Sequence, residues 1–305
     1  MTTSRERTGL LFAGLCALNG AFLPGLAKLT TNQADPLFVA AATTAFGGLF
    51  AACVLAARGE LALLARPMLR GRLALIGFLG TAVAFLLYFE GTRRAGAIAA
   101  SLCVQVEPAY SLFLTWLALG HRPTRRRVLS TIVLLAGIGL AMGAGGLTTS
   151  AGVWLLLATP LCWQLSHLVV LRGLPGVDPM VLTGARYVWG GIFLAATWLA
   201  RGGLGSLPPR DELLSLLPTL AVQGILLAYM GTAFWYQSIV RLDLARATSI
   251  VVPSIPLLSF GASWLLVGEV ATPRQWGGLL LTLVGVVAFV TAPDVKLRPP
   301  PGLSG

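Results

Sequence analysis

The sequence predicts an all-α, polytopic membrane protein with ten transmembrane helices, arranged as two inverted five-helix repeats. Of its 305 residues, 56% are hydrophobic and only 11% are charged, whereas a soluble domain has about 25% charged residues. The apolar residues also fall in blocks of about 20, which is the length a helix needs to cross about 30 Å of hydrocarbon. Composition and block length together exclude a soluble globular class.

Short connectors rich in Gly, Pro, Ser and Asn separate the apolar blocks and leave no room for a domain outside the membrane. The first block follows Arg5 and Arg7, as in a signal peptide, but it lacks a clean cleavage site and more spans follow it. We therefore expect it to be a helix of the folded protein. The predicted spans are 8–29, 37–57, 73–92, 96–118, 128–145, 152–172, 179–200, 214–239, 245–267 and 275–292.

The net charge of +11 lies in short clusters between the spans. This placement is typical of the orientation signal of membrane proteins and not of a nucleic-acid-binding surface. With the N-terminus inside, 15 basic residues face the cytoplasm: Arg5, Arg7, Arg58, Arg66, Arg70, Arg72, Arg122, Arg125, Arg126, Arg127, Arg172, Arg241, Arg246, Lys296 and Arg298. Six would lie outside: Lys28, Arg93, Arg94, Arg201, Arg210 and Arg274. We expect a multi-pass protein of the inner (plasma) membrane with both termini in the cytoplasm.

An internal repeat appears when the sequence is moved by 148 residues. Rare residue types then coincide: Tyr88 with Tyr236, Pro108 with Pro256, Trp116 with Trp264, Gly120 with Gly268, and Gly137 with Gly285. The predicted units are 1–148 and 149–293, followed by a disordered tail over 294–305. Five spans per unit is an odd number, so the second unit is inverted relative to the first. Inverted repeats are typical of secondary transporters, although a duplicated fold without a transport role stays open.

The sequence resembles the EamA family of the drug/metabolite transporter superfamily. The resemblance rests on residues 20–28, on residues 79–90, on Glu107-Pro108 and on Gly268-Glu269. The sequence departs from the family pattern at Gly120-His121 and Ile255-Pro256, where the family has Gly-Glu and Glu-Pro. The resemblance implies ten helices around a central cavity and transport of metabolites, often amino acids or drug-like compounds. It fixes no substrate, because the family has no universal binding motif.

Glu107 is the leading candidate for a functional charge, because it lies about 11 residues into its span and ionisable groups inside a membrane are costly. It is a candidate for substrate binding and for ion coupling through protons. The alternative is a structural acid, bonded to a neighbouring helix or paired with Arg186 of the seventh span. Lys28 and Glu90, near the outer ends of their spans, are expected to reach the interface or to form an outer gate.

Polar and aromatic residues within the central spans are candidates for binding a small amphipathic solute, through amides that orient it and rings that hold its apolar or cationic part. Alternatives are an interfacial aromatic belt for the residues near span ends, and helix packing for the histidine. Two prolines matched by the repeat, Pro108 and Pro256, are candidate hinges or static kinks. The candidate binding residues are Asn19, Gln105, Glu107, Trp163, Gln164, His167, Tyr229 and Tyr236.

We expect a secondary transporter that moves an amino acid or an amphipathic, drug-like solute across the inner membrane by alternating access. We expect it to be an exporter and a monomer that needs neither cofactor nor metal. A passive channel and a lipid-type flippase remain as alternatives. An intramembrane enzyme is not expected, because the chain has only two histidines and lacks the HExxH pattern.

Overall fold

The computed structural model describes residues 4–119, 123–242 and 244–292, which fold into helices without any strand. The predicted tail 294–305 lies outside the described residues. The α-helices are α1 (Ser4–Gln33), α2 (Pro36–Ala57), α3 (Pro67–Gly77), α4 (Ala84–Ala95), α5 (Ala97–Cys103), α6 (Glu107–Leu119), α7 (Arg125–Thr149), α8 (Ala151–Gly173), α9 (Pro179–Ala200), α10 (Arg210–Ala221), α11 (Gly231–Leu242), α12 (Leu244–Val267) and α13 (Pro273–Val290).

A membrane-spanning all-α fold is confirmed, and each predicted span is helical. Among the described residues, nine helical stretches are long and apolar enough to cross a membrane. The seventh predicted span, 179–200, forms the 22-residue α9 but is not one of the nine. Arg186 near its middle makes this helix less apolar. The count of ten spans therefore stays a prediction.

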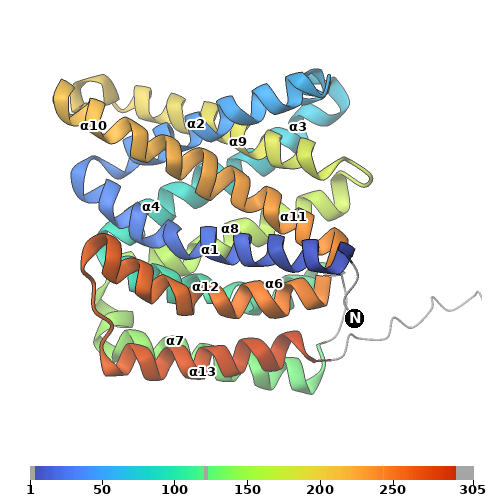
Figure 1. The fold of residues 1–305 in the computed structure, drawn as a ribbon, viewed down its shortest axis with the longest axis vertical. Coiled ribbons are helices and arrows are strands. Elements are labelled where there is room, and N and C mark those ends of the chain that lie inside the picture. Colours follow the sequence, from blue (N-terminus) through green and yellow to red (C-terminus); the bar gives the residue numbers. More distant parts are fainter. Residues whose placement is uncertain (1–3, 120–122, 243, 293–305) are drawn as a thin grey trace, which may run out of the picture.

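The helices lie roughly side by side, and the N-terminus marks one end of the bundle (Figure 1). We call this end the terminal side and the opposite end the distal side. The α1 helix runs from the terminal to the distal side, and the turn between α12 and α13 lies on the distal side (Figure 1). The α7 and α13 helices pack mainly against each other and form a pair along one flank.

Glycines allow α7 and α13 to approach closely. A Cβ added at Gly137 would lie 2.8 Å from the Gly278 carbonyl oxygen, and one at Gly285 would lie 2.7 Å from Cα of Leu134. Small residues at such positions let helix backbones pack in lipid, where no hydrophobic effect drives helices together.

Several helices begin where the sequence provides a cap. Asp35 accepts hydrogen bonds from the N–H groups of Leu37 and Phe38 and precedes Pro36 at the start of α2. Asp178 and Pro179 start α9 in the same way. An acidic cap followed by proline is a strong signal for a helix start, because proline needs no hydrogen-bond acceptor there.

Three spans are interrupted near their middle. The third span is α3 and α4 joined by a π-helical segment at Phe78–Val83, the first π segment. The eighth is α10 and α11 joined by the second π segment, Val222–Met230. The fourth is α5 and α6 joined by a 3₁₀ turn at Val104–Val106. Such departures from the α-helix often mark functional positions.

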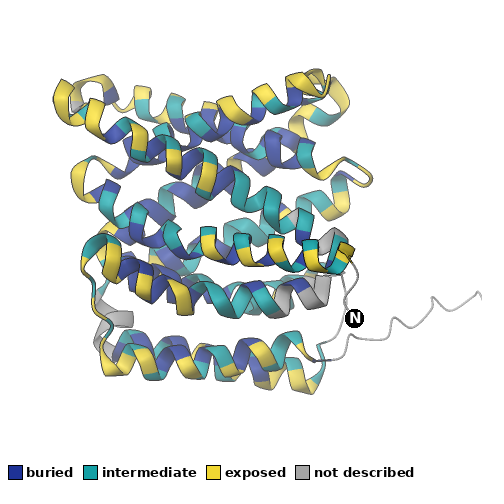
Figure 2. Cartoon of the chain, in the orientation of Figure 1, coloured by how far each residue is buried: buried dark blue, intermediate teal, exposed yellow. Residues whose placement is uncertain are grey.

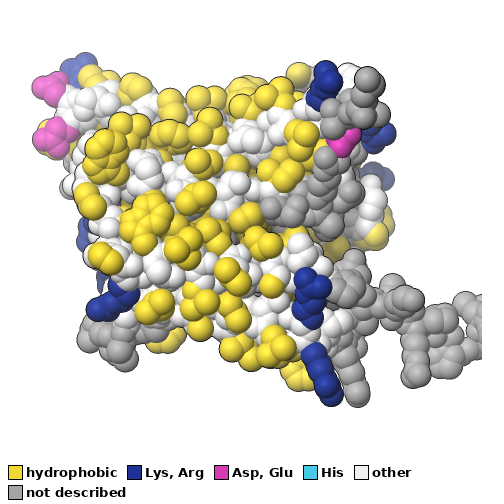
Figure 3. Space-filling view, turned by 60° about the horizontal axis from the view of Figure 1, so that its bottom comes forward, with side chains coloured by type: hydrophobic (Ala, Val, Ile, Leu, Met, Phe, Trp, Pro, Cys, Tyr) yellow, Lys and Arg dark blue, Asp and Glu magenta, His cyan; other side chains and the backbone are white. Residues whose placement is uncertain are grey.

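The surface of the bundle fits a bilayer. In Figure 3 apolar side chains cover the middle of the visible face, and the coloured Lys, Arg, Asp and Glu side chains lie toward its two ends. Buried residues line the sides of the helices that face each other (Figure 2). This distribution gives an apolar belt between two charged rims.

Candidate functional site

Glu107 and Gln164 join the fourth and sixth spans. Gln164 Nε2 donates a 2.7 Å hydrogen bond to Oε1 of Glu107. Glu107 is the first residue of α6, directly after the 3₁₀ turn. Pro108 explains this break, because its ring excludes a regular helical hydrogen bond to the preceding turn. The carboxylate therefore lies where the backbone of the span changes conformation.

The packing of the fourth span changes at the same point. Every residue of α5 is buried, as are Gln105 and Val106. From Glu107 to residue 118, by contrast, none of the described side chains is buried. The distal half of the span is thus enclosed, and the terminal half is only partly covered. Glu107 lies at the boundary between the two halves.

An aromatic contact joins α8 to α4 at the residue before Gln164. Trp163 precedes Gln164 on α8, and its ring centroid lies 6.5 Å from that of Tyr88 on α4. The Trp163 Nε1–H is buried and has no hydrogen-bond partner among the described residues. An indole N–H can only donate, so it is available to a bound acceptor.

Arg186 lies near this cluster without forming an ion pair with Glu107. Its Nη2 donates a 2.7 Å hydrogen bond to the carbonyl oxygen of Gly80, in the first π segment. Arg186 therefore joins α9 to the first π segment and does not pair with Glu107. The His167 side chain is exposed, three residues beyond Gln164 on α8.

Asn19 contacts the second π segment, which contains Tyr229. Asn19 Nδ2 donates a 2.8 Å hydrogen bond to the carbonyl oxygen of Leu226. Tyr229 is buried, and its hydroxyl has no partner among the described residues. Its ring packs edge-on against that of Tyr187, with centroids 5.8 Å apart.

A chain of aromatic contacts connects the two groups of candidate residues. The centroids of successive rings in this series lie 5.7 to 6.3 Å apart as far as Tyr88. The last step, from Tyr88 to Trp163, is 6.5 Å. The order of the rings is Tyr229, Tyr187, Phe85, Phe89, Tyr88 and Trp163. The aromatic chain crosses the core from the eighth span to the sixth.

The remaining predicted residues are Gln105, Tyr236 and the two candidate hinge prolines. Gln105 is buried in the 3₁₀ turn, and its Oε1 has no partner among the described atoms. The side chain of Tyr236 lies outside the described residues. Pro256 lies within α12, which continues past it as one helix, whereas Pro108 adjoins a break. The hinge roles of both prolines stay predictions.

Sequence reasoning missed Tyr88 and Gly80 as parts of this region. Tyr88 had a usable signal, since the repeat pairs it with Tyr236. The role of Gly80 had none, because a free carbonyl in a π segment depends on backbone geometry. The surface hollow lined by Asn32, Gln33 and Glu212, about 360 Å³ in volume, contains none of the predicted site residues.

Comparison with known proteins agrees with this architecture. The sequence matches the EamA-like transporter family over residues 7–143 and again over residues 150–291. It is 27% identical over 228 residues to the "Probable terminal-alkyne amino-acid exporter" of Streptantibioticus cattleyicolor, covering 70% of this chain and 71% of that protein. It is 30% identical over 224 residues to the "Uncharacterized transporter YdfC" of Bacillus subtilis, covering 70% and 68%. A solved crystal structure aligns with a TM-score of 0.62 and 18% identity over 93% of this chain and 96% of that one, a likeness of fold.

Proposed function

Because the chain belongs to the EamA-like transporter family, we propose that it is a secondary transporter that exports a small metabolite by alternating access. The exporter works as a monomer in the inner membrane, with both termini in the cytoplasm. Its two units, 1–148 and 149–293, are inverted copies. The two separate family matches and the π segments in the third span of each unit support this division.

The observation that carries the proposal is the Glu107–Gln164 pair at the boundary in the fourth span. A carboxylate inside a membrane is costly, so its presence in a span favours a functional role. Here one of its oxygens accepts from Gln164, and the other accepts no hydrogen bond among the described residues. That oxygen is available to an ammonium, a guanidinium or a hydroxyl group of a substrate.

Aromatic residues of the core suggest the substrate class. Trp163, which precedes the Glu107 partner Gln164 in sequence, packs against Tyr88, and the aromatic chain continues from there to Tyr229. An aromatic face attracts a cation as well as an apolar group. The substrate is therefore an amphipathic solute with a cationic or hydrogen-bonding group. Amino acids with apolar side chains are the first compounds to test, since one relative is named for exporting an amino acid.

Two further features fit export and proton coupling. The terminal half of the fourth span is the less covered half, and in the proposed orientation it faces the cytoplasm, from which an exporter takes its substrate. Glu107 can bind either a proton or a cationic substrate, and competition between them would couple export to proton entry.

Counterflow in proteoliposomes tests the proposal. Vesicles loaded with unlabelled amino acid should take up the labelled compound transiently, and uptake should saturate with concentration. A passive channel gives uptake without counterflow. A flippase instead moves a fluorescent lipid between leaflets, and either result would replace the carrier proposal.

A further inference from the structure

Glu269 connects the end of the ninth span to the start of the fourth. Its Oε1 and Oε2 accept hydrogen bonds of 3.0 and 2.9 Å from the backbone N–H of Ala97, and Oε2 accepts a third of 3.0 Å from Ile98. The bonded groups are more than 170 residues apart in sequence. The contact therefore ties residues of the second family match to residues of the first.

Two glycines make this contact possible. Gly268 ends α12 with a φ of +67°, and its N–H bonds back to the carbonyl oxygen of Trp264, which turns the chain off the helix. Gly96 has a φ of +94°, and a Cβ there would lie 2.9 Å from Oε1 of Glu269. A side chain at position 96 would therefore displace the Glu269 carboxylate from the N–H groups that it accepts from.

The physical basis of the contact is the start of a helix. The first N–H groups of a helix have no partner within it, and its N-terminus carries a partial positive charge. A carboxylate there makes charge-assisted hydrogen bonds, about twice as strong as neutral ones. Among the described residues no Lys or Arg forms an ion pair with Glu269. Its charge is therefore balanced chiefly by the N–H groups of Ala97 and Ile98.

We propose that Glu269 is a latch that holds the distal end of the transport path closed and that must release before the path opens on that side. The inference rests on the proposed alternating access. It is supported by the packing of the fourth span, which is fully buried next to the latch and only partly covered beyond Glu107. On this proposal, the buried distal half of the fourth span is the closed end of the path.

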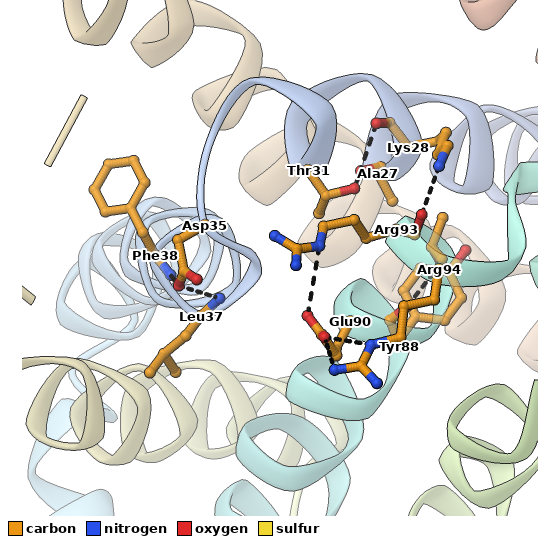
Figure 4. A network of polar contacts seen from close by, with 11 residues as sticks. Ala27, Lys28, Thr31, Asp35, Leu37, Phe38, Tyr88, Glu90, Arg93 and Arg94 are labelled. Carbon is orange, nitrogen blue, oxygen red and sulfur yellow. Dashed lines mark hydrogen bonds and ion pairs between the residues drawn. The ribbon is translucent and has the colours of Figure 1, made fainter. Parts of the chain in front are cut away.

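A second polar network on the distal side does not join the two family matches. Lys28 Nζ donates a 2.6 Å hydrogen bond to the carbonyl oxygen of Arg93, and Glu90 pairs with Arg93 and Arg94 (Figure 4). These contacts tie α1 to α4, and both helices belong to the first family match. Lys28 and Glu90 do not bond each other directly, so the predicted gate pair is not formed here.

The latch has no acidic counterpart in the repeat. The 148-residue offset pairs Glu269 with His121 and Ala97 with Ala245. A neutral imidazole accepts one hydrogen bond and an imidazolium accepts none, so histidine cannot replace a carboxylate that accepts three. A carboxylate at position 269 without one at position 121 would bias the protein toward the distal-closed state.

Cysteine accessibility tests the latch without using transport. In a chain with Cys16, Cys53, Cys103 and Cys162 replaced, Ser101→Cys puts a near-isosteric reporter in the buried part of α5. Its labelling by an impermeant maleimide added from the distal side should be slow. Glu269→Gln should raise this rate about tenfold or more, since loss of a charge-assisted hydrogen bond shifts an equilibrium by that order. Glu269→Asp should fall between the two.

The matched control is Glu212→Gln, the same change at an exposed acid in the first turn of α10 on the distal side. It should leave the labelling rate unchanged. An unchanged rate in Glu269→Gln, with the elution profile and melting temperature preserved, would overturn the latch. So would an equal rise in Glu212→Gln. Faster labelling in a protein that shows no counterflow would keep the latch and overturn the transport proposal, so the two failures can be told apart.

Discussion

Gln164 donates a hydrogen bond to Glu107 and so joins α8 to the first residue of α6. It lies about one helical turn before His167 on α8. This contact fixes one oxygen of the carboxylate and leaves the other available.

Replacing Glu107 by Gln should abolish transport, or at least its pH dependence, while the protein stays folded and inserted. The amide keeps the size and a hydrogen-bonding group but can neither carry a negative charge nor exchange a proton. Counterflow measured at several pH values checks this, with Glu107→Asp as the variant that keeps the charge. Normal transport by Glu107→Gln with the same pH sensitivity would make Glu107 a structural acid.

Removing the Gln164 amide should weaken transport less than removing the carboxylate. In Gln164→Ala the Glu107 carboxylate loses the hydrogen bond that the neutral amide donates to it. A hydrogen bond to a charged group is worth about 1.5–3 kcal/mol. We expect a raised KM for the substrate and a lower melting temperature in detergent. Gln164→Glu should be more harmful, since it places a second carboxylate against the first. Equal transport by both variants would contradict the role given to the pair.

Arg186→Ala should destabilise the protein, because the Gly80 carbonyl oxygen loses its partner in the first π segment. Leaving a buried acceptor unpaired costs about 1–3 kcal/mol. Arg186→Lys keeps the positive charge but loses the planar guanidinium. If the charge matters for transport, Lys should restore activity more than stability. Thermal melting and counterflow on both variants separate the two roles.

The orientation predicts where a cysteine can be labelled in intact cells. Thr124→Cys, on the terminal side, should not react with an impermeant maleimide added from outside. Gln33→Cys, exposed at the distal end of α1, should react readily and serves as the positive control. The reverse pattern would place the termini outside and invert the proposed direction of export.

The close pair of α7 and α13 gives a prediction about stability. Gly137→Ala should lower the melting temperature, because the new methyl group would lie 2.8 Å from the Gly278 carbonyl oxygen and force the helices apart. Gly277→Ala is the matched control, since its methyl group would meet only Leu140 Cδ2 at 3.8 Å. It should be neutral or slightly stabilising, as alanine favours helices. Equal effects of the two changes would contradict tight packing at Gly137.

The sequence was informative where local chemistry decides the structure. Apolar blocks predicted the spans, and in the structure Asp35-Pro36 and Asp178-Pro179 start two of these helices with the local chemistry of a cap. Glu107 was identified because a charge inside a span is rare. Its partner was not, since Gln164 is 57 residues away and many polar residues compete for that position. Helix periodicity alone also cannot show which oxygen Arg186 would reach, because Gly80 lies in a π segment.

The two π segments also bear on how the chain arose. Residues 78–82 of the first segment, moved by the 148-residue offset, fall on residues 226–230 of the second. A π segment typically holds an extra residue in a helical turn, and it is rarely kept without a use. If both copies inherited it, the bulge is older than the gene duplication that joined them. The ancestor would then have been a single five-helix chain, inserted in both orientations and assembled as an antiparallel pair before one polypeptide carried both halves.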